Sequence, residues 1–260
     1  MSPANFHRDR RKLDGFRPGH IFMLQPGATW LNQDKPRPYV LVTPCDLARR
    51  GTLVYGSTRQ TERAAAASSI EVAPRALGVN ANGLLARTFF YPGVLFPTRY
   101  DALPPHIGNL GTAMEALRHA LAYALGIGSG TCLSPDAPAR SRRGRIVLLD
   151  PVFESAFDTR FAVVLTQHQY SSEQRYQAIV PILRGDGAVV ASNIVRVQRQ
   201  PWLSIFPKPT ASALLVAPVI QSVWHPEHIA AETQFVVDEG SLHALEERLC
   251  AMLAIEPRSD

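Results

Sequence analysis

The stretch 35–38, Lys-Pro-Arg-Pro, places Arg37 between two prolines and directly before the apolar run 39–42. A guanidinium group stays positively charged at any working pH, and its fork of N–H groups can hold two oxygens of one phosphate. The flanking prolines fix the backbone, which would reduce the entropy lost when such a side chain is ordered. The alternative is a solvated charge at a strand edge, with prolines that deny ladder hydrogen bonds. Arg37 is therefore the first candidate for holding an anionic group.

The spacings of the histidines and cysteines argue against a metal or redox site. The three cysteines are far apart in the chain: Cys45, Cys132 and Cys250. Their distance and odd number argue against a disulfide framework, and metal-ligand spacing is absent. His225 and His228 are three residues apart, but Pro226 between them and the lack of a third ligand favour a turn. The sequence therefore predicts neither a metal nor a cofactor.

Length and charge limit what a site around Arg37 could serve. With 260 residues and 46% apolar composition, the chain can bury a core in one large domain or two small ones. The net charge of +5 and the pI near 9.4 favour a polyanionic partner only weakly. Part of the excess charge lies in two basic clusters, 7–12 and 140–145, which we expect to be a solvated tail and a solvated linker.

No segment has the composition of a membrane anchor or an export signal. No run approaches the roughly 20 apolar residues of a membrane helix, and the first residues lack the apolar stretch of a signal peptide. We therefore expect a cytoplasmic protein that does not contact a membrane.

The strands that would position Arg37 occur twice in the chain. The matching segments of the two halves are 19–27 and 144–152, 35–43 and 158–166, and 51–60 and 176–186. The first pair shares a Gly, a polar residue, a short apolar strand and a Pro, and the second pair places Arg37 and Arg160 at equivalent strand starts. Later strands are suggested by 92–96 and 218–224. This repetition indicates a tandem duplication.

Each half also ends in one amphipathic helix. The apolar face of the first is formed by Met114, Leu117, Leu121 and Leu125, and that of the second by Leu242, Leu245, Leu249 and Leu253. Thr112 with Glu115 predicts a capping box for the first helix, Gly126 predicts its end, and Ser241 is the expected N-cap of the second. Short strands followed by one helix predict a mainly β fold in which a curled antiparallel sheet is sealed by that helix.

Composition shifts divide the chain into four parts. Residues 1–16 form a basic N-terminal tail, and 128–142 are rich in Gly, Ser, Pro and Arg without apolar periodicity, which is typical of a linker. The two folded units are therefore expected over 17–127 and 143–256.

Together these features resemble the PemK/MazF toxins of bacterial toxin–antitoxin pairs. The resemblance rests on the Gly-x-Ile that opens a strand, the run Lys-Pro-Arg-Pro-Tyr-Val-Leu-Val, an apolar strand ending in Gly-Ser-Thr-Arg-Gln, and the Leu-rich helix, and it covers most of 17–127. It implies an SH3-like barrel and a metal-independent endoribonuclease that cuts mRNA. The second half resembles the family more loosely and is also similar to the gyrase poison CcdB, whose C-terminal Trp-Gly pair is missing here.

By this resemblance, Arg37 matches the catalytic arginine of the family and Thr58 its catalytic threonine, each supplying hydrogen bonds to the scissile phosphate. PemK-type members also carry a histidine in the loop before the arginine and an Arg-x-Asp on a later strand, and both are missing from this sequence. The general base is therefore unidentified. The candidates for proton transfer or RNA contact are His20, Trp30, Asp34, Lys35, Arg59 and Gln60.

The second half is expected to carry a degenerate site. Arg160 persists there, but Leu183 stands in place of Thr58 and Phe161 in place of Pro38. The resemblance thus predicts two tandem SH3-like barrels that pair within one chain as a monomeric pseudo-dimer, with RNA as a partner and an antitoxin protein as a second candidate partner. The alternative is a catalytically silent tandem barrel that binds RNA, an antitoxin-like peptide or another protein.

Overall fold

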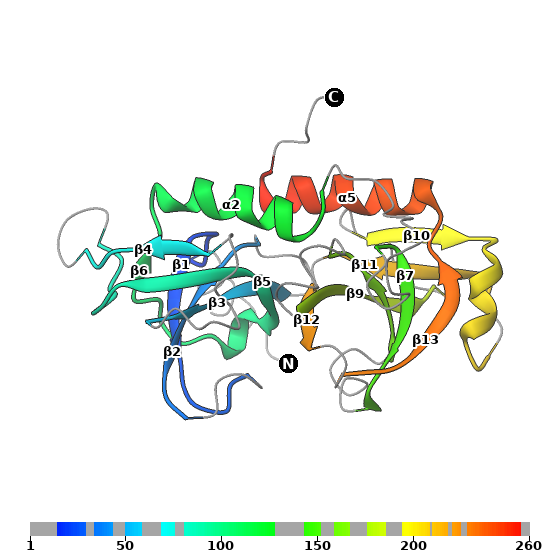
Figure 1. The fold of residues 1–260 in the computed structure, drawn as a ribbon, viewed down its shortest axis with the longest axis horizontal. Coiled ribbons are helices and arrows are strands. Elements are labelled where there is room, and N and C mark those ends of the chain that lie inside the picture. The colour runs from blue at the N-terminus through cyan, green and yellow to red at the C-terminus, as the bar shows by residue number, and fades with distance from the viewer. Residues whose placement is uncertain are drawn as a thin grey trace, which may run out of the picture.

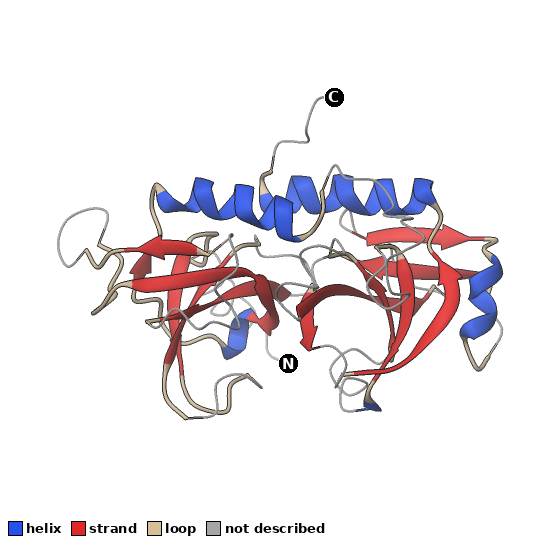
Figure 2. Cartoon of the chain, viewed as in Figure 1, coloured by secondary structure: helices blue, strands red, loops and turns tan. Residues whose placement is uncertain are grey.

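The fold is mainly β, with two long helices along one side of the molecule (Figures 1 and 2). The computed structural model describes residues 15–29, 34–43, 50–58, 69–75, 81–127, 143–151, 159–166, 176–185, 194–208, 210–217, 220–224 and 228–255. The α-helices within these residues are α2 (Ala113–Ala124) and α5 (Glu239–Leu253). The expected fold class, mainly β with one long helix late in each half, is confirmed at this level. The predicted tail and linker lie outside the described residues, apart from the last residues of the tail.

Two antiparallel sheets lie side by side beneath the helices (Figure 1). The first contains β1 (His20–Leu24), β2 (Arg37–Leu41), β3 (Arg50–Ser57), β4 (Ile70–Val72), β5 (Thr88–Arg99) and β6 (Gly108–Asn109). The second contains β7 (Arg145–Leu149), β8 (Phe161–Val164), β9 (Tyr176–Arg184), β10 (Ile194–Gln198), β11 (Ser212–Val216), β12 (Gln221–Trp224) and β13 (Ile229–Val236). Two short 3-10 helices, η1 (Tyr100–Ala102) and η4 (Pro201–Ile205), follow β5 and β10.

The two sheets have the same strand order. It is β4-β5-β3-β2-β1-β6 in the first and β10-β11-β9-β8-β7-β13 in the second, where β12 also pairs with β9. An irregularity recurs as well. The partner of Tyr55 is Tyr91 but the partner of Val54 is Leu95, so β5 advances four residues while β3 moves one. Along β9, Ile182 pairs with Leu215 of β11 and Ile179 pairs with Gln221 of β12. The partner segment therefore advances six residues while β9 moves three. The same surplus of three supports the duplication, with β11 and β12 together corresponding to β5.

One hydrophobic core is shared by the two halves. It lies on one face of each sheet and includes Val40 and Leu117 of the first half together with Val163 and Leu245 of the second. Strand β5 also contacts β9 and β12 of the other sheet. Burial of apolar surface is the main favourable term in folding, so a common core ties the stability of each half to the other.

The opposite face of each sheet has its own core, and the two cores differ in composition. We call the first the aromatic face, and its buried members are Phe22, Leu24, Tyr39, Leu41, Leu53, Tyr91, Val94, Phe96 and Tyr100. The second is the aliphatic face, and its buried members are Val147, Leu149, Ala162, Val164, Ile179, Leu214, Val216 and Ile229. The alternation of side chains along each strand assigns successive residues to the shared core and to one of these faces.

The helices begin differently from the prediction. Thr112 precedes α2 with helical φ and ψ and makes no side-chain cap hydrogen bond, so the predicted capping box is absent. The N-cap of α5 is Asp238 rather than Ser241, because the Asp238 carboxylate accepts a hydrogen bond from the Ser241 N–H at 2.9 Å. Gly126 has φ +63° and follows the last turn of α2, as predicted.

The expectation of a solvated basic cluster at 140–145 is wrong for its described arginines. The Arg143 side chain is fully buried and donates hydrogen bonds to the carbonyl oxygens of Leu125 and Leu165. It also forms an ion pair with Glu246 of α5. Arg145 is buried too, and its Nη1 donates to the Thr233 carbonyl at 2.8 Å. Arg143 thus links the second half to the end of α2, whereas Arg145 is bonded within the second half.

Among the described residues, none of the helices combines the length and the apolar character required to cross a bilayer.

Candidate functional site

Arg37 is the first residue of β2, at the strand start that the sequence predicted. It is the cross-strand partner of Leu24 and is partly exposed, while Pro38 and Tyr39 after it are buried. Because alternate residues share a face, Arg37 lies on the same face of β2 as Tyr39 and Leu41, which is the aromatic face. The arginine therefore stands where a buried aromatic surface meets solvent.

The hydroxyl group that the structure places beside Arg37 belongs to Ser57. Tyr39 pairs with Tyr55, and the same register continued by two residues sets Ser57 opposite Arg37. The Arg37 Nη1 donates a hydrogen bond to the Ser57 Oγ at 3.3 Å. The Ser57 side chain is buried, whereas Thr58 follows the end of β3 and is exposed. A role for Thr58 stays a prediction, and Ser57 is a site residue that the sequence interpretation missed.

Gly56 permits the close packing that brings Ser57 to this position. A Cβ atom on Gly56 would lie 2.8 Å from the Phe90 ring and 3.0 Å from the Pro38 carbonyl oxygen. Real Cβ atoms do not approach other atoms so closely without a shift of the surroundings. A side chain at this position would therefore push β3 away from β2 and separate Ser57 from Arg37.

Aromatic rings adjoin the Arg37–Ser57 pair. Tyr55 and Phe89 are partly exposed and pack against the aromatic face. The Tyr39 and Tyr55 rings meet edge to face with centroids 5.6 Å apart, and Tyr55 stacks on Tyr91 at 6.0 Å. The Tyr39 hydroxyl shares a 2.6 Å hydrogen bond with the Thr29 Oγ1.

The Tyr39 phenol remains protonated in this setting. Burial raises its pKa well above the ordinary value, and the hydrogen bond with Thr29 and the charge of Arg37 oppose this effect only in part. A neutral phenol can orient a ligand by hydrogen bonding but does not serve as a base near neutral pH.

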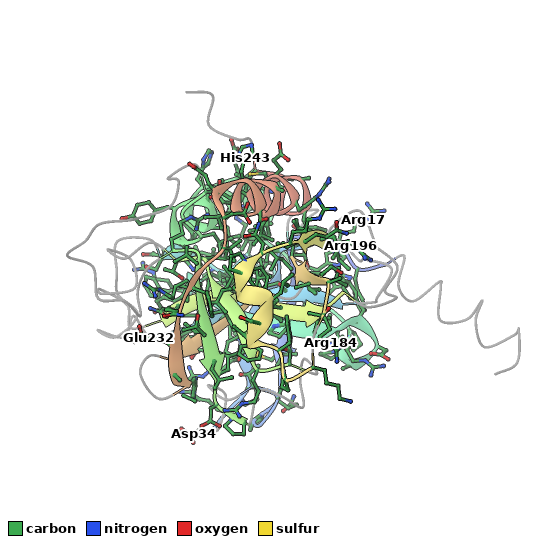
Figure 3. All side chains as sticks on the ribbon, turned by 90° about the vertical axis from the view of Figure 1, so that its right-hand side faces the viewer. Arg17, Asp34, Arg184, Arg196, Glu232 and His243 are labelled. Atoms are coloured by element: carbon green, nitrogen blue, oxygen red, sulfur yellow. The ribbon has the colours of Figure 1, made fainter. Side chains whose placement is uncertain are left out.

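His20 is not brought together with Arg37. It is at the start of β1 whereas Leu24, the partner of Arg37, is at the end, so four residues or about 13 Å of strand separate them. The His20 ring stacks on His106 at 4.0 Å, and its Nδ1 accepts a hydrogen bond from the Arg17 N–H at 3.3 Å. Burial, then the charges of His106 and Arg17, lower the His20 pKa. Figure 3 shows this separation through neighbouring residues: Arg17, whose N–H binds His20, lies toward the helices, and Asp34, three residues before Arg37, lies at the opposite end of the molecule.

The remaining predicted residues are placed only in part. Asp34 and Lys35 are exposed and precede Arg37, the first residue of β2, by three and two residues. Trp30, Arg59 and Gln60 lie outside the described residues, as do the cysteines Cys45 and Cys132.

The second half has an apolar residue where the first half has Ser57. Ala162 pairs with Pro181, and the same register continued by two residues sets Leu183 opposite Arg160. Leu183 therefore corresponds to Ser57, and Arg184 corresponds to Thr58, which corrects the alignment made from the sequence. The Arg160 Nε donates to the Leu149 carbonyl at 3.0 Å, so this arginine is bonded to the backbone of its own hairpin.

The two halves differ along one row of five residues that lie side by side on neighbouring strands of each sheet. We call the row of the first sheet the site row, and it consists of Leu24, Arg37, Ser57, Phe89 and Glu71. The corresponding row of the second sheet consists of Leu149, Arg160, Leu183, Leu214 and Arg196. Glu71 is itself paired with Arg87 at 3.0 Å. Only the site row combines a partly exposed guanidinium, a hydroxyl and an aromatic ring, which together can contact a phosphate and a base.

Comparison with known proteins does not identify a family for this chain. No protein-family model matches the chain, and no curated protein matches it. Function is therefore inferred from the residues and their arrangement.

Proposed function

We propose that the first half is a metal-independent endoribonuclease acting on single-stranded RNA, as the resemblance to the PemK/MazF toxins implies. The observation that carries this proposal is the Arg37 Nη1–Ser57 Oγ contact of 3.3 Å at the open end of the aromatic face. A guanidinium oriented by a hydroxyl and left partly exposed is suited to binding a phosphate that arrives from solvent.

The reaction is a transesterification within RNA. The 2′-oxygen forms a bond to the neighbouring phosphorus while the bond from phosphorus to the 5′-oxygen breaks, which leaves a 2′,3′-cyclic phosphate and a 5′-hydroxyl. The 2′-hydroxyl proton passes to a base, and the leaving 5′-oxygen takes up a proton. Arg37 stabilises the negative charge that develops on the phosphorane, and Ser57 holds the guanidinium in place. Thr58, exposed beside Ser57, is a second candidate for contact with the phosphate.

The second half is proposed to be the structural partner in an intramolecular pair of SH3-like barrels. The equal strand order of the two sheets and the shared core support this arrangement. In this proposal the chain acts as a monomer that resembles a two-fold dimer. Growth inhibition by the nuclease and control by an antitoxin protein belong to the same proposal and rest on the family resemblance.

Cleavage by the purified protein in EDTA tests the proposal. Wild-type protein is expected to cut single-stranded RNA and to leave 2′,3′-cyclic phosphate ends or their hydrolysis products. Arg37→Ala should lower the rate by about 100-fold or more, as expected for the loss of a charge-stabilising donor. Arg160→Ala is the matched control and should cleave at nearly the wild-type rate. Full activity of Arg37→Ala, or strict dependence on a divalent metal, would contradict this mechanism.

A catalytically silent RNA-binding protein is the second candidate function. The position of His20 favours it, because the described histidine that the sequence offered as a base lies about 13 Å of strand away from Arg37. RNA binding that depends on Arg37, together with the absence of cleavage by wild-type protein, would support this alternative.

A further inference from the structure

The aromatic character of the first sheet is not required by the fold. The strand registers give the equivalent positions on the two faces: Phe22 and Val147, Tyr39 and Ala162, Tyr55 and Pro181, Phe89 and Leu214, and Tyr91 and Val216. Each of these five aromatic residues is thus replaced by a non-aromatic, apolar one in a sheet with the same strand order. Packing alone is satisfied by Leu214 and Pro181, so the rings of the first half need another explanation.

Two of these rings are partly exposed and lie in the site row or next to it. Tyr55 and Phe89 are partly exposed, whereas Tyr39 and Tyr91 are buried. Phe89 is the cross-strand partner of Ser57, and Tyr55 precedes Ser57 by two residues on the same face of β3. Neighbouring strands are about 4.8 Å apart and residues two apart on a strand about 7 Å apart. Both rings therefore start within about 7 Å of the serine that holds Arg37.

We propose that Tyr55 and Phe89 form a stacking platform for the bases of single-stranded RNA whose backbone phosphate is bound by Arg37. Aromatic rings stack on any base because every base has a π-face, and the neighbouring guanidinium supplies the backbone contact. This inference depends on RNA being the ligand of the proposed function, but it does not depend on cleavage. It explains why the aromatic rings and the Arg37–Ser57 pair occur in the same half.

Binding of RNA that cannot be cleaved tests the platform. The probe is a fluorescently labelled, mixed-sequence pool of single-stranded decamers in which every sugar is 2′-O-methylated, so that the nucleophile is blocked. Its affinity for the full-length protein is measured by fluorescence anisotropy at several salt concentrations. The variants are Tyr55→Leu, Tyr55→Phe and Phe89→Leu, the last of which introduces the residue type found at Leu214.

Tyr55→Leu and Phe89→Leu should each weaken binding by roughly 10-fold, within the range given by the loss of one stacked base. Tyr55→Phe keeps the ring and should bind within about two-fold of wild type. The dependence of affinity on salt should be unchanged in these variants, because the phosphate contacts remain, whereas Arg37→Ala should reduce it. Phe235→Leu removes a partly buried ring from β13 of the second half and is the matched control, with no expected loss.

Outcomes separate the platform from the nuclease. If wild-type protein binds the probe and the leucine variants bind it less well, the platform stands even where unmodified RNA is not cut. If correctly folded leucine variants bind as tightly as wild type, or Tyr55→Phe loses as much affinity as Tyr55→Leu, the platform is overturned while cleavage can persist. Wild-type protein that does not bind the probe would overturn the platform, and cleavage of unmodified RNA in EDTA then tests the nuclease by itself. Near-UV and far-UV circular dichroism establish correct folding of each variant.

Discussion

At the scale of single residues, the contact between Arg37 and Ser57 predicts that the serine acts through the arginine. Ser57→Ala should lower the cleavage rate by about 10-fold, the size expected from losing one hydrogen bond to a charged group. In the Arg37→Ala background, Ser57→Ala should cause almost no further loss. The measurement is a double-mutant cycle on the initial rate of RNA cleavage. If the two substitutions lower the rate by factors that multiply in the double variant, Ser57 acts on RNA directly and not through Arg37.

His20 gives a second prediction at this scale, in the dependence of stability on pH. Its native pKa lies below the ordinary value of 6.5, mainly because of burial. As the pH falls through about 6.5, the unfolded chain takes up the proton more readily than the native protein, so stability is complete above this pH and declines below it. The urea midpoint should therefore fall between pH 7 and pH 5. His20→Gln should flatten this decline, and His119→Gln on the exposed side of α2 should not.

Arg37 was predictable from the sequence because its two prolines mark a strand start, but Ser57 was not. The choice between Ser57 and Thr58 depends on the register between β2 and β3, and the residues between these strands carry no pattern that fixes it. For the same reason Leu183 was matched to the wrong member of that pair. The platform residue Phe89 was also missed, because its position opposite Ser57 depends on the pairing of β5 with β3.

At the scale of elements, the observed start of α5 predicts which residue caps it. Asp238→Ala should destabilise the protein by about 1 kcal/mol, because the N–H of Ser241 loses its acceptor. The melting temperature should fall by about 2–4 °C for a chain of this size. Ser241→Ala is the control and should change little. If Ser241→Ala lowers the melting temperature more than Asp238→Ala does, Ser241 is the N-cap, as the sequence predicted.

Helices and inner strands were more predictable than edge strands. The apolar face of α2 and the strands β1, β2, β7 and β8 follow from periodicity. In contrast, the edge strands β4, β6, β10 and β13 were not predicted. β4 and β6 have only three and two residues, and β13 contains three consecutive polar residues, so none of these three has a clear alternation. β10 does alternate between buried and exposed positions, but over only five residues. The run 218–224 predicted β12 but not β11, since the residues that correspond to one strand in the first half are split between two in the second.

At the scale of the whole molecule, the buried ion pair between Arg143 and Glu246 should dominate the stability of the second half. Glu246→Leu alone leaves a buried guanidinium without its carboxylate and should cost about 3–5 kcal/mol. Arg143→Met combined with Glu246→Leu should recover only part of this loss, because the Leu125 and Leu165 carbonyls still lose the Arg143 donor. The measurement is urea unfolding of the wild type, both single variants and the double variant. Asp101→Ala, which removes an exposed pair with Arg99, should cause no measurable change. A double variant as unstable as the sum of both losses would argue against this account.

The shared core leads to a prediction about assembly. Full-length protein should be a 28.6 kDa monomer by light scattering, because the two halves already bury each other's apolar faces. A fragment of residues 1–130 would expose Val40, Leu117 and their neighbours, so it should be insoluble or self-associated. A stable full-length dimer together with a soluble, monomeric and fully active fragment would contradict the pseudo-dimer.

The contacts of Arg143 also have a consequence for synthesis of the chain. Its partner Glu246 is 103 residues later, so Arg143 and the end of α2 leave the ribosome well before α5 does. At translation rates of about 5–20 residues per second, roughly 5–20 s separate these events. During that interval the first half carries Arg37 but lacks the polypeptide that covers its part of the core. Completion of the last helix therefore becomes the step that matures the protein, and prematurely terminated chains keep their arginine in an unfinished fold.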